Sequence, residues 1–88
     1  MKTGIAVFPE DKFIIYCDGK TVDFIGTADI INDFKTIIND KASLYNAIRT
    51  TKGDQFNPVE YFATSSMNFI PDMYDYSPQK LEEVKKAL

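Results

Sequence analysis

Two apolar segments at the start of the chain, followed by a turn signal, constrain the fold more than any other feature. Residues 3–8 and 12–17 are rich in apolar and aromatic side chains, and Pro9-Glu10-Asp11 between them is typical turn chemistry. Asp18-Gly19 then predicts a two-residue hairpin turn, because a type I′ turn needs positive φ at both central positions. A third strand follows over 20–25. The pattern therefore predicts a three-stranded antiparallel meander.

The second and third predicted strands differ in their patterns. The second is an almost continuous apolar run, which indicates that both of its faces are covered. In the third strand, Val22 and Phe24 alternate with Thr21 and Asp23, which is typical of a strand that is open on one side. We therefore expect the third strand to lie at an exposed edge, where it could pair with a second copy in a homodimer.

Helical periodicity replaces the strand pattern after Gly26. Thr27 suits the N-cap position of a helix. One apolar stripe at helical spacing is formed by Ile30, Ile31, Phe34, Ile37 and Ile38. Residues 42–48 continue this helix or form another, and Asn57-Pro58 and Ser77-Pro78 begin two more. The predicted class is thus α+β, with a small three-stranded antiparallel meander followed by three to four helices packed on one face.

Length and composition indicate the organisation and the compartment. The 88 residues are expected to form a single domain, 1–88. Cys17 is the only cysteine, so no internal disulfide can form, and a cytoplasmic location is expected. No apolar run approaches the roughly 20 residues of a membrane helix, so no membrane partner is expected. The acidic net charge of −3 argues against direct binding to nucleic acid.

Several catalytic and metal-binding classes require side chains that this chain lacks. There is no histidine, which removes the commonest general base, the Ser-His triads and most zinc sites. The glycines are isolated, so no glycine-rich loop can hold a phosphate. We therefore expect no metal, no cofactor and no enzymatic activity.

The order Thr3-Gly4-Ile5-Ala6-Val7, then a hairpin with Asp18-Gly19-Lys20-Thr21, resembles the start of proteasome-like N-terminal nucleophile hydrolases, over roughly the first forty residues. The resemblance implies Thr3 as the nucleophile and Asp18 as the acid that orients it. In that family the α-amino group of the nucleophile acts as the base, so the nucleophile begins the mature chain. Because Met1 and Lys2 precede Thr3, the resemblance implies a reduced or inactive relative of this family, and the alternative is that Asp18-Gly19 is only a hairpin turn.

An aromatic and acidic segment near the end of the chain is the remaining candidate site. The candidate binding residues are Tyr61, Asp72, Met73, Tyr74, Asp75 and Tyr76. Tyrosine and methionine are enriched at protein interfaces, and the carboxylates would complement a basic groove on a partner. The alternative interpretation is that Phe62, Phe69 and Tyr74 fill the open face of the small sheet.

The hypothesis that follows is a small non-enzymatic cytoplasmic protein that binds and modulates another protein. A phage-encoded inhibitor of a host factor is one specific form of this hypothesis. The first alternative is the reduced or inactive hydrolase, with Thr3 and Asp18 as its site. The second alternative is an acidic mimic of nucleic acid.

Overall fold

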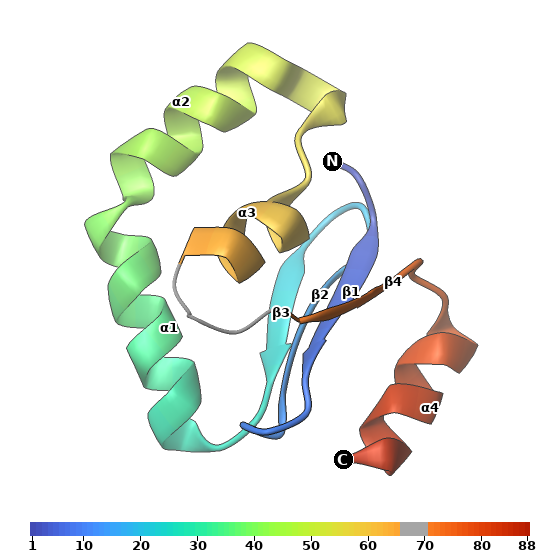
Figure 1. Cartoon of the computed structure of the whole chain (residues 1–88). Coiled ribbons are helices and arrows are strands. Elements are labelled where there is room, and N and C mark those ends of the chain that lie inside the picture. Colours follow the sequence, from blue (N-terminus) through green and yellow to red (C-terminus); the bar gives the residue numbers. More distant parts are fainter. Residues whose placement is uncertain (66–70) are drawn as a thin grey trace.

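A four-stranded antiparallel sheet with helices on both faces forms the molecule, as the computed structural model of residues 1–65 and 71–88 describes it (Figure 1). The strands are β1 (Gly4–Phe8), β2 (Phe13–Cys17), β3 (Val22–Ile25) and β4 (Asp72–Tyr74), in the order β3-β2-β1-β4. The helices are α1 (Ala28–Asp40), α2 (Ala42–Lys52), α3 (Pro58–Ser65) and α4 (Pro78–Ala87), with a short 3-10 helix, η1 (Gly53–Gln55), after α2. The predicted α+β class is confirmed.

Two details of the fold differ from the sequence-based expectation. β4 adds a fourth strand beside β1, antiparallel to it. In addition, α4 packs against the face of the sheet opposite to α1 and α3, so the helices do not all lie on one face. A three-residue strand has too few residues to show a periodic pattern, so only its pairing with β1 defines it. The chain reaches the far face of the sheet by way of this strand, and α4 follows there (Figure 1).

The hairpin between β2 and β3 turns one residue later than the Asp18-Gly19 pattern predicts. Gly19 has a positive φ of 99°, whereas the φ of Asp18 is not positive. Asp18 precedes the turn, and its Oδ1 accepts hydrogen bonds from the N–H groups of Lys20 (2.9 Å) and Thr21 (3.0 Å). Glycine therefore occupies the first central position of the turn, as type II′ turns require.

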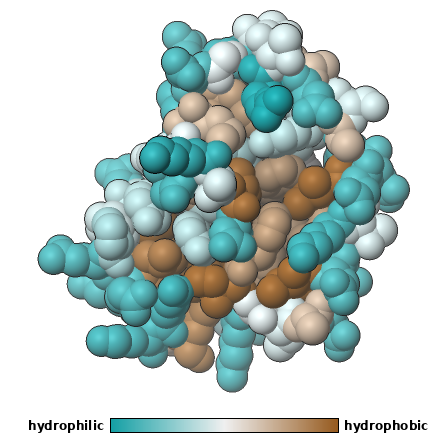
Figure 2. Space-filling model, turned by 180° about the vertical axis from the view of Figure 1, so that it is seen from behind, coloured by the Kyte–Doolittle hydropathy of each residue, from teal (hydrophilic) through white to brown (hydrophobic). Residues whose placement is uncertain are grey.

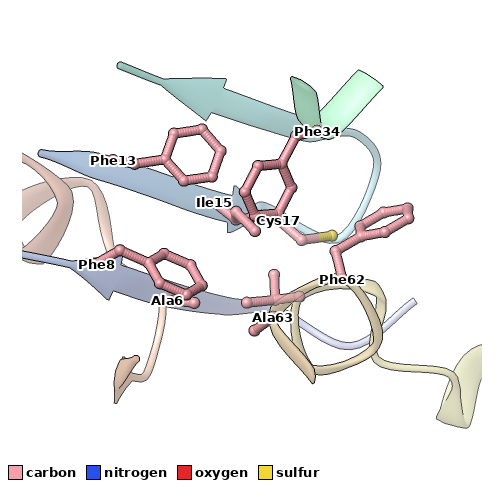
Figure 3. Packing of buried hydrophobic residues seen from close by; sticks show 9 residues of the cluster. Ala6, Phe8, Phe13, Ile15, Cys17, Phe34, Phe62 and Ala63 are labelled. Carbon is pink, nitrogen blue, oxygen red and sulfur yellow. The ribbon is translucent and has the colours of Figure 1, made fainter. Parts of the chain in front are cut away.

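The larger core lies between the sheet and the helices α1 and α3. Figure 3 shows Phe8 and Phe13 from the strands, Phe34 from α1 and Phe62 from α3 gathered around one interior. Phe34 is the buried residue of α1, and its ring centroid lies 4.5 Å from that of Phe13. Cys17 is buried in the same cluster, as a small apolar side chain. The predicted apolar stripe of the first helix thus meets the sheet through Phe34.

A smaller core lies on the other face of the sheet, beneath α4. There Ile5, Val7 and Ile14 of the sheet form a buried cluster with Leu81 and Val84 of α4. β1 and β2 are therefore covered on both faces, which confirms the expectation for the second strand. β3 lies at an edge, as predicted, and β4 forms the opposite edge.

Apolar surface remains on the side of the molecule that faces away from the viewer in Figure 1. Figure 2 shows apolar side chains across the middle of that side, bordered by polar ones. Half-buried apolar side chains occur along β3 at Val22, Phe24 and Ile25 and at the start of α1 at Ile30 and Ile31. β3, at the edge of the sheet, is thus less buried than β1 and β2.

Candidate functional site

One row of side chains crosses the sheet from edge to edge on the α4 side. The strand register places Asp23 of β3 opposite Tyr16 of β2. In the same register, Ile5 of β1 lies between Tyr16 and Tyr74 of β4. Directly opposed residues of antiparallel strands project to the same face, and Ile5 belongs to the core beneath α4. The row therefore brings two tyrosines and a carboxylate from three different strands onto one face.

Tyr76 and Lys80 complete this surface from the segment that contains α4. The ring of Tyr76 stacks on that of Tyr16, with centroids 6.3 Å apart and planes inclined by 8°. Lys80 Nζ lies 4.4 Å from the ring centroid of Tyr74, within the range of cation–π attraction. Ser77 caps α4 by accepting a hydrogen bond at Oγ from the Lys80 N–H at 3.0 Å. This cap fixes the start of α4 and so places Lys80 near Tyr74.

We name this surface the tyrosine face, and its members are Tyr16, Tyr74, Tyr76, Asp18, Asp23 and Lys80. The Tyr16 hydroxyl donates a hydrogen bond to Asp23 Oδ2 at 3.2 Å. Partial burial, and next the negative charge of Asp23 and this hydrogen bond, raise the pKa of Tyr16 above its ordinary value of 10.0. Tyr16 is therefore a neutral hydrogen-bond donor at physiological pH.

Asp18 adds a second carboxylate beside Tyr16. The N–H groups of Thr21 and then Lys20 hold the pKa of Asp18 below its ordinary value of 3.8. The negative charge of Asp18 contributes to the raised pKa of Tyr16, so the two side chains are close enough to interact. The tyrosine face thus carries the ionised carboxylate of Asp18 close to the neutral ring of Tyr16 at neutral pH.

The predicted binding residues of β4 project to both sides of the sheet. Met73 pairs with Ala6 and projects toward the side of α1 and α3, whereas Asp72 and Tyr74 project toward α4. The side chains of Met73 and Tyr74 are 47% and 37% exposed, and Asp75 next to them is exposed as well. The structure therefore presents an accessible aromatic and acidic surface at this edge of the sheet.

Tyr61 lies apart from the tyrosine face. It is on α3, on the opposite side of the sheet, where its ring packs 5.9 Å from Tyr45 and 5.8 Å from Phe56 between centroids. Tyr61 also lines a cleft of about 270 Å³ together with Lys2, Lys52 and other residues. The structure thus separates Tyr61 from the other predicted binding residues.

The alternative interpretation is that Phe62, Phe69 and Tyr74 fill the open face of the sheet. Of the two that the structure describes, Phe62 fits this interpretation and Tyr74 does not. Phe62 of α3 is buried in the larger core, as that interpretation predicts. Tyr74 is partly exposed on β4 instead. Phe69 lies outside the described residues.

Thr3 and Asp18 lie side by side at one end of the sheet. Gly4 pairs with Cys17, so the preceding Thr3 lies next to Asp18 in the register. Thr3 Cγ2 is also 3.5 Å from the position that a Cβ atom would take at Gly19. The structure thus brings together the two residues that the hydrolase resemblance singles out, although Asp18 Oδ1 already accepts hydrogen bonds from the turn.

The sequence pattern does not single out Tyr16 and Asp23 as site residues, although the turn carries the necessary information. A two-residue turn centred on Gly19 and Lys20 pairs residue 16 with residue 23, which is the observed register. A turn centred on Asp18 and Gly19 would instead pair residue 16 with residue 21. The position of the turn therefore decides whether the tyrosine and the carboxylate face each other.

Neither a metal cluster nor a membrane span is present in the described part of the chain, residues 1–65 and 71–88. There, no three His, Cys, Asp or Glu side chains gather so that they could hold a metal ion. No described helix is both long enough and apolar enough to cross a bilayer.

Comparison with protein-family models, with curated proteins and with solved structures found no match. The tyrosine face is thus the feature that suggests a function.

Proposed function

We propose that the protein is a non-enzymatic binding domain that modulates another protein by binding a basic segment of it on the tyrosine face. The placement of Tyr16, Tyr74 and Asp23 on one face of the sheet, with Tyr76 stacked on Tyr16, is the observation that carries this proposal. Tyrosine rings bury a large area with little loss of conformational freedom, and they are enriched among the residues that dominate interface energies. Carboxylates beside the rings favour a partner of positive charge.

The contact between Lys80 and Tyr74 supports a cationic partner. An ammonium group already lies 4.4 Å from the centre of this ring. A lysine or arginine of a partner can make the equivalent contact with another ring of the tyrosine face. A cation–π contact contributes about 0.5–1 kcal/mol at an exposed site, and a charge-assisted hydrogen bond to a carboxylate adds direction.

An NMR titration of the intact protein with basic and acidic peptides tests the proposal. The probes are a short peptide of alternating lysine and valine and its counterpart of alternating glutamate and valine. We expect the lysine peptide to shift the amide resonances of Tyr16, Asp23 and Tyr74, and its Kd to rise as salt is added. The substitution Tyr74→Ala should weaken this binding by roughly tenfold, because it removes an interface ring.

Leu44 provides a matched control for Tyr74. Its side chain is also apolar and exposed, at 53%, but it lies on α2, outside the tyrosine face. Leu44→Ala should therefore leave the Kd of the lysine peptide unchanged. Equal binding of the glutamate peptide, or shifts confined to α2 and α3, would contradict the proposal. A simple acidic mimic of nucleic acid would share the salt dependence but not the effect of Tyr74→Ala.

A second candidate function is the reduced N-terminal nucleophile hydrolase, which the proximity of Thr3 and Asp18 favours. This chemistry needs a free α-amino group on Thr3. In the structure Met1 and Lys2 precede Thr3, and the Lys2 N–H donates to the Phe56 carbonyl at 3.0 Å. Intact mass spectrometry of the purified protein separates the candidates. A mature chain that begins at Thr3 supports the hydrolase, and one that retains Met1 and Lys2 excludes self-nucleophile chemistry at Thr3.

A further inference from the structure

The two edges of the sheet differ in how far their backbone groups are already occupied. An edge strand presents N–H and C=O groups that can pair with an extended segment of another chain. β3 forms one edge and β4 forms the other. The edge with unoccupied groups is the one that can accept a further strand.

At the β3 edge, a side chain occupies one of the outward backbone groups. The Asp18 N–H donates to the Thr21 carbonyl at 3.4 Å, and bonded residues alternate along antiparallel strands. Asp23 therefore bonds to β2, whereas the backbone groups of Val22 and Phe24 point outward. The Phe24 N–H donates to Asp23 Oδ1 at 2.8 Å. Asp23 thus closes part of the edge at which pairing with a second copy was expected.

At the β4 edge, the same alternation leaves the backbone of Met73 pointing outward. Residues of β2 that bond to β3 alternate with residues that bond to β1, and the same alternation continues along β1. The backbone groups of Ile5 and Val7 therefore point away from β2 and toward β4. Their partners on β4 are Tyr74 and Asp72, so these two residues complete the ladder to β1. In the part of the chain that is described, no strand lies on the outer side of β4. The N–H and C=O of Met73 are therefore directed at that side.

Building on the proposed function, we propose that the outer edge of β4 accepts an extended basic segment of the partner as an additional strand. Asp72 and Asp75 flank Met73 and are exposed, so an added strand runs past two carboxylates. Lys80 is 3.4 Å from Glu83 Oε2, which already balances its charge. The edge of β4 thus matches a strand that carries lysine or arginine.

A second copy of β4 fits this edge poorly. Two such strands paired about Met73 would bring Asp72 and Asp75 of both copies onto one short ladder. Mutual repulsion among these four carboxylates, gathered on one short ladder, opposes the pairing. A basic segment has the opposite effect at the same positions, because each of its cations can neutralise a carboxylate.

The substitution Met73→Pro tests strand addition within the protein. Proline lacks an N–H, and at an outward-facing edge position its loss leaves the ladder to β1 intact. We expect Met73→Pro to keep the native Tm. It should weaken the binding of the lysine–valine peptide by about tenfold, because at least one main-chain hydrogen bond and the close approach of the peptide are lost. The comparison variant Met73→Ala removes the side chain but keeps the N–H, so a smaller loss of affinity than with Met73→Pro assigns the difference to the main chain.

Backbone methylation of the peptide gives the same test without any change to the protein. One peptide is N-methylated at every valine and another at every lysine, so each has one blocked strand edge. Strand addition requires that one of the two binds much more weakly and that the other binds like the unmethylated peptide. If both methylated peptides and Met73→Pro bind with the native Kd, strand addition is wrong while the proposed function stands. If no lysine peptide shifts the tyrosine face, the proposed function fails as well.

Discussion

The substitution Phe34→Ala tests the main packing contact between α1 and the sheet. Phe34 is 1% exposed. Its ring centroid lies 4.5 Å from Phe13, 6.1 Å from Phe8 and 6.4 Å from Phe24. Truncation of a buried phenylalanine lowers the free energy of unfolding by about 3–5 kcal/mol, through lost burial and the cavity that remains. A domain of 88 residues has a total stability of about 4–13 kcal/mol, so this loss is a large share of it.

Urea unfolding followed by circular dichroism measures this loss directly. The matched control is Ile37→Ala on the same helix, since Ile37 is half-buried and outside the core cluster. We expect the control to cost about 1 kcal/mol, as is typical of a partly exposed position. If Phe34→Ala cost no more than Ile37→Ala, the ring would not hold α1 to the sheet, and the reasoning about the larger core would be refuted.

Gly26 and Tyr16 allow two further tests. A Cβ atom at Gly26 would lie 2.8 Å from Cδ1 of the buried Phe13. Gly26→Ala should therefore lower the free energy of unfolding by about 1–3 kcal/mol. An unchanged Tm would show that the Phe13 ring can move aside without loss of stability. Because the folded pKa of Tyr16 is raised, its contribution to stability is complete below the unfolded value of 10.0 and is lost as the pH rises through the folded pKa. Asp23→Asn should lower the pKa of Tyr16 in an NMR titration of the tyrosine rings, and an unchanged pKa would mean that Asp23 is not a cause of the shift.

Most helices and strands of this protein follow from local chemistry that the sequence displays. Thr27 Oγ1 accepts a hydrogen bond from the N–H three residues later at 3.4 Å, and the predicted caps Asn57 and Ser77 do the same at 3.3 Å and 3.0 Å. The apolar stripe that contains Phe34 predicts the first helix in the same way. These features involve residues within one helical turn of each other, so they can be identified without knowledge of the tertiary structure.

The tyrosine face required the tertiary structure, because its members are distant in the sequence. Tyr74 joins the row only because it pairs with Ile5. The row projects toward α4 because side chains alternate between the two faces of a sheet, and a shift of one residue in the register would move them to the other face. The Asp18-Gly19 pattern predicted the hairpin but misplaced its turn by one residue, which hides the pairing of Tyr16 with Asp23. The sequence by itself thus determined the α+β class, the first three strands and the helix starts, since these depend on local periodicity and capping. The fourth strand, the side on which α4 packs and the composition of the tyrosine face depend on pairing between distant segments, which only the folded chain decides.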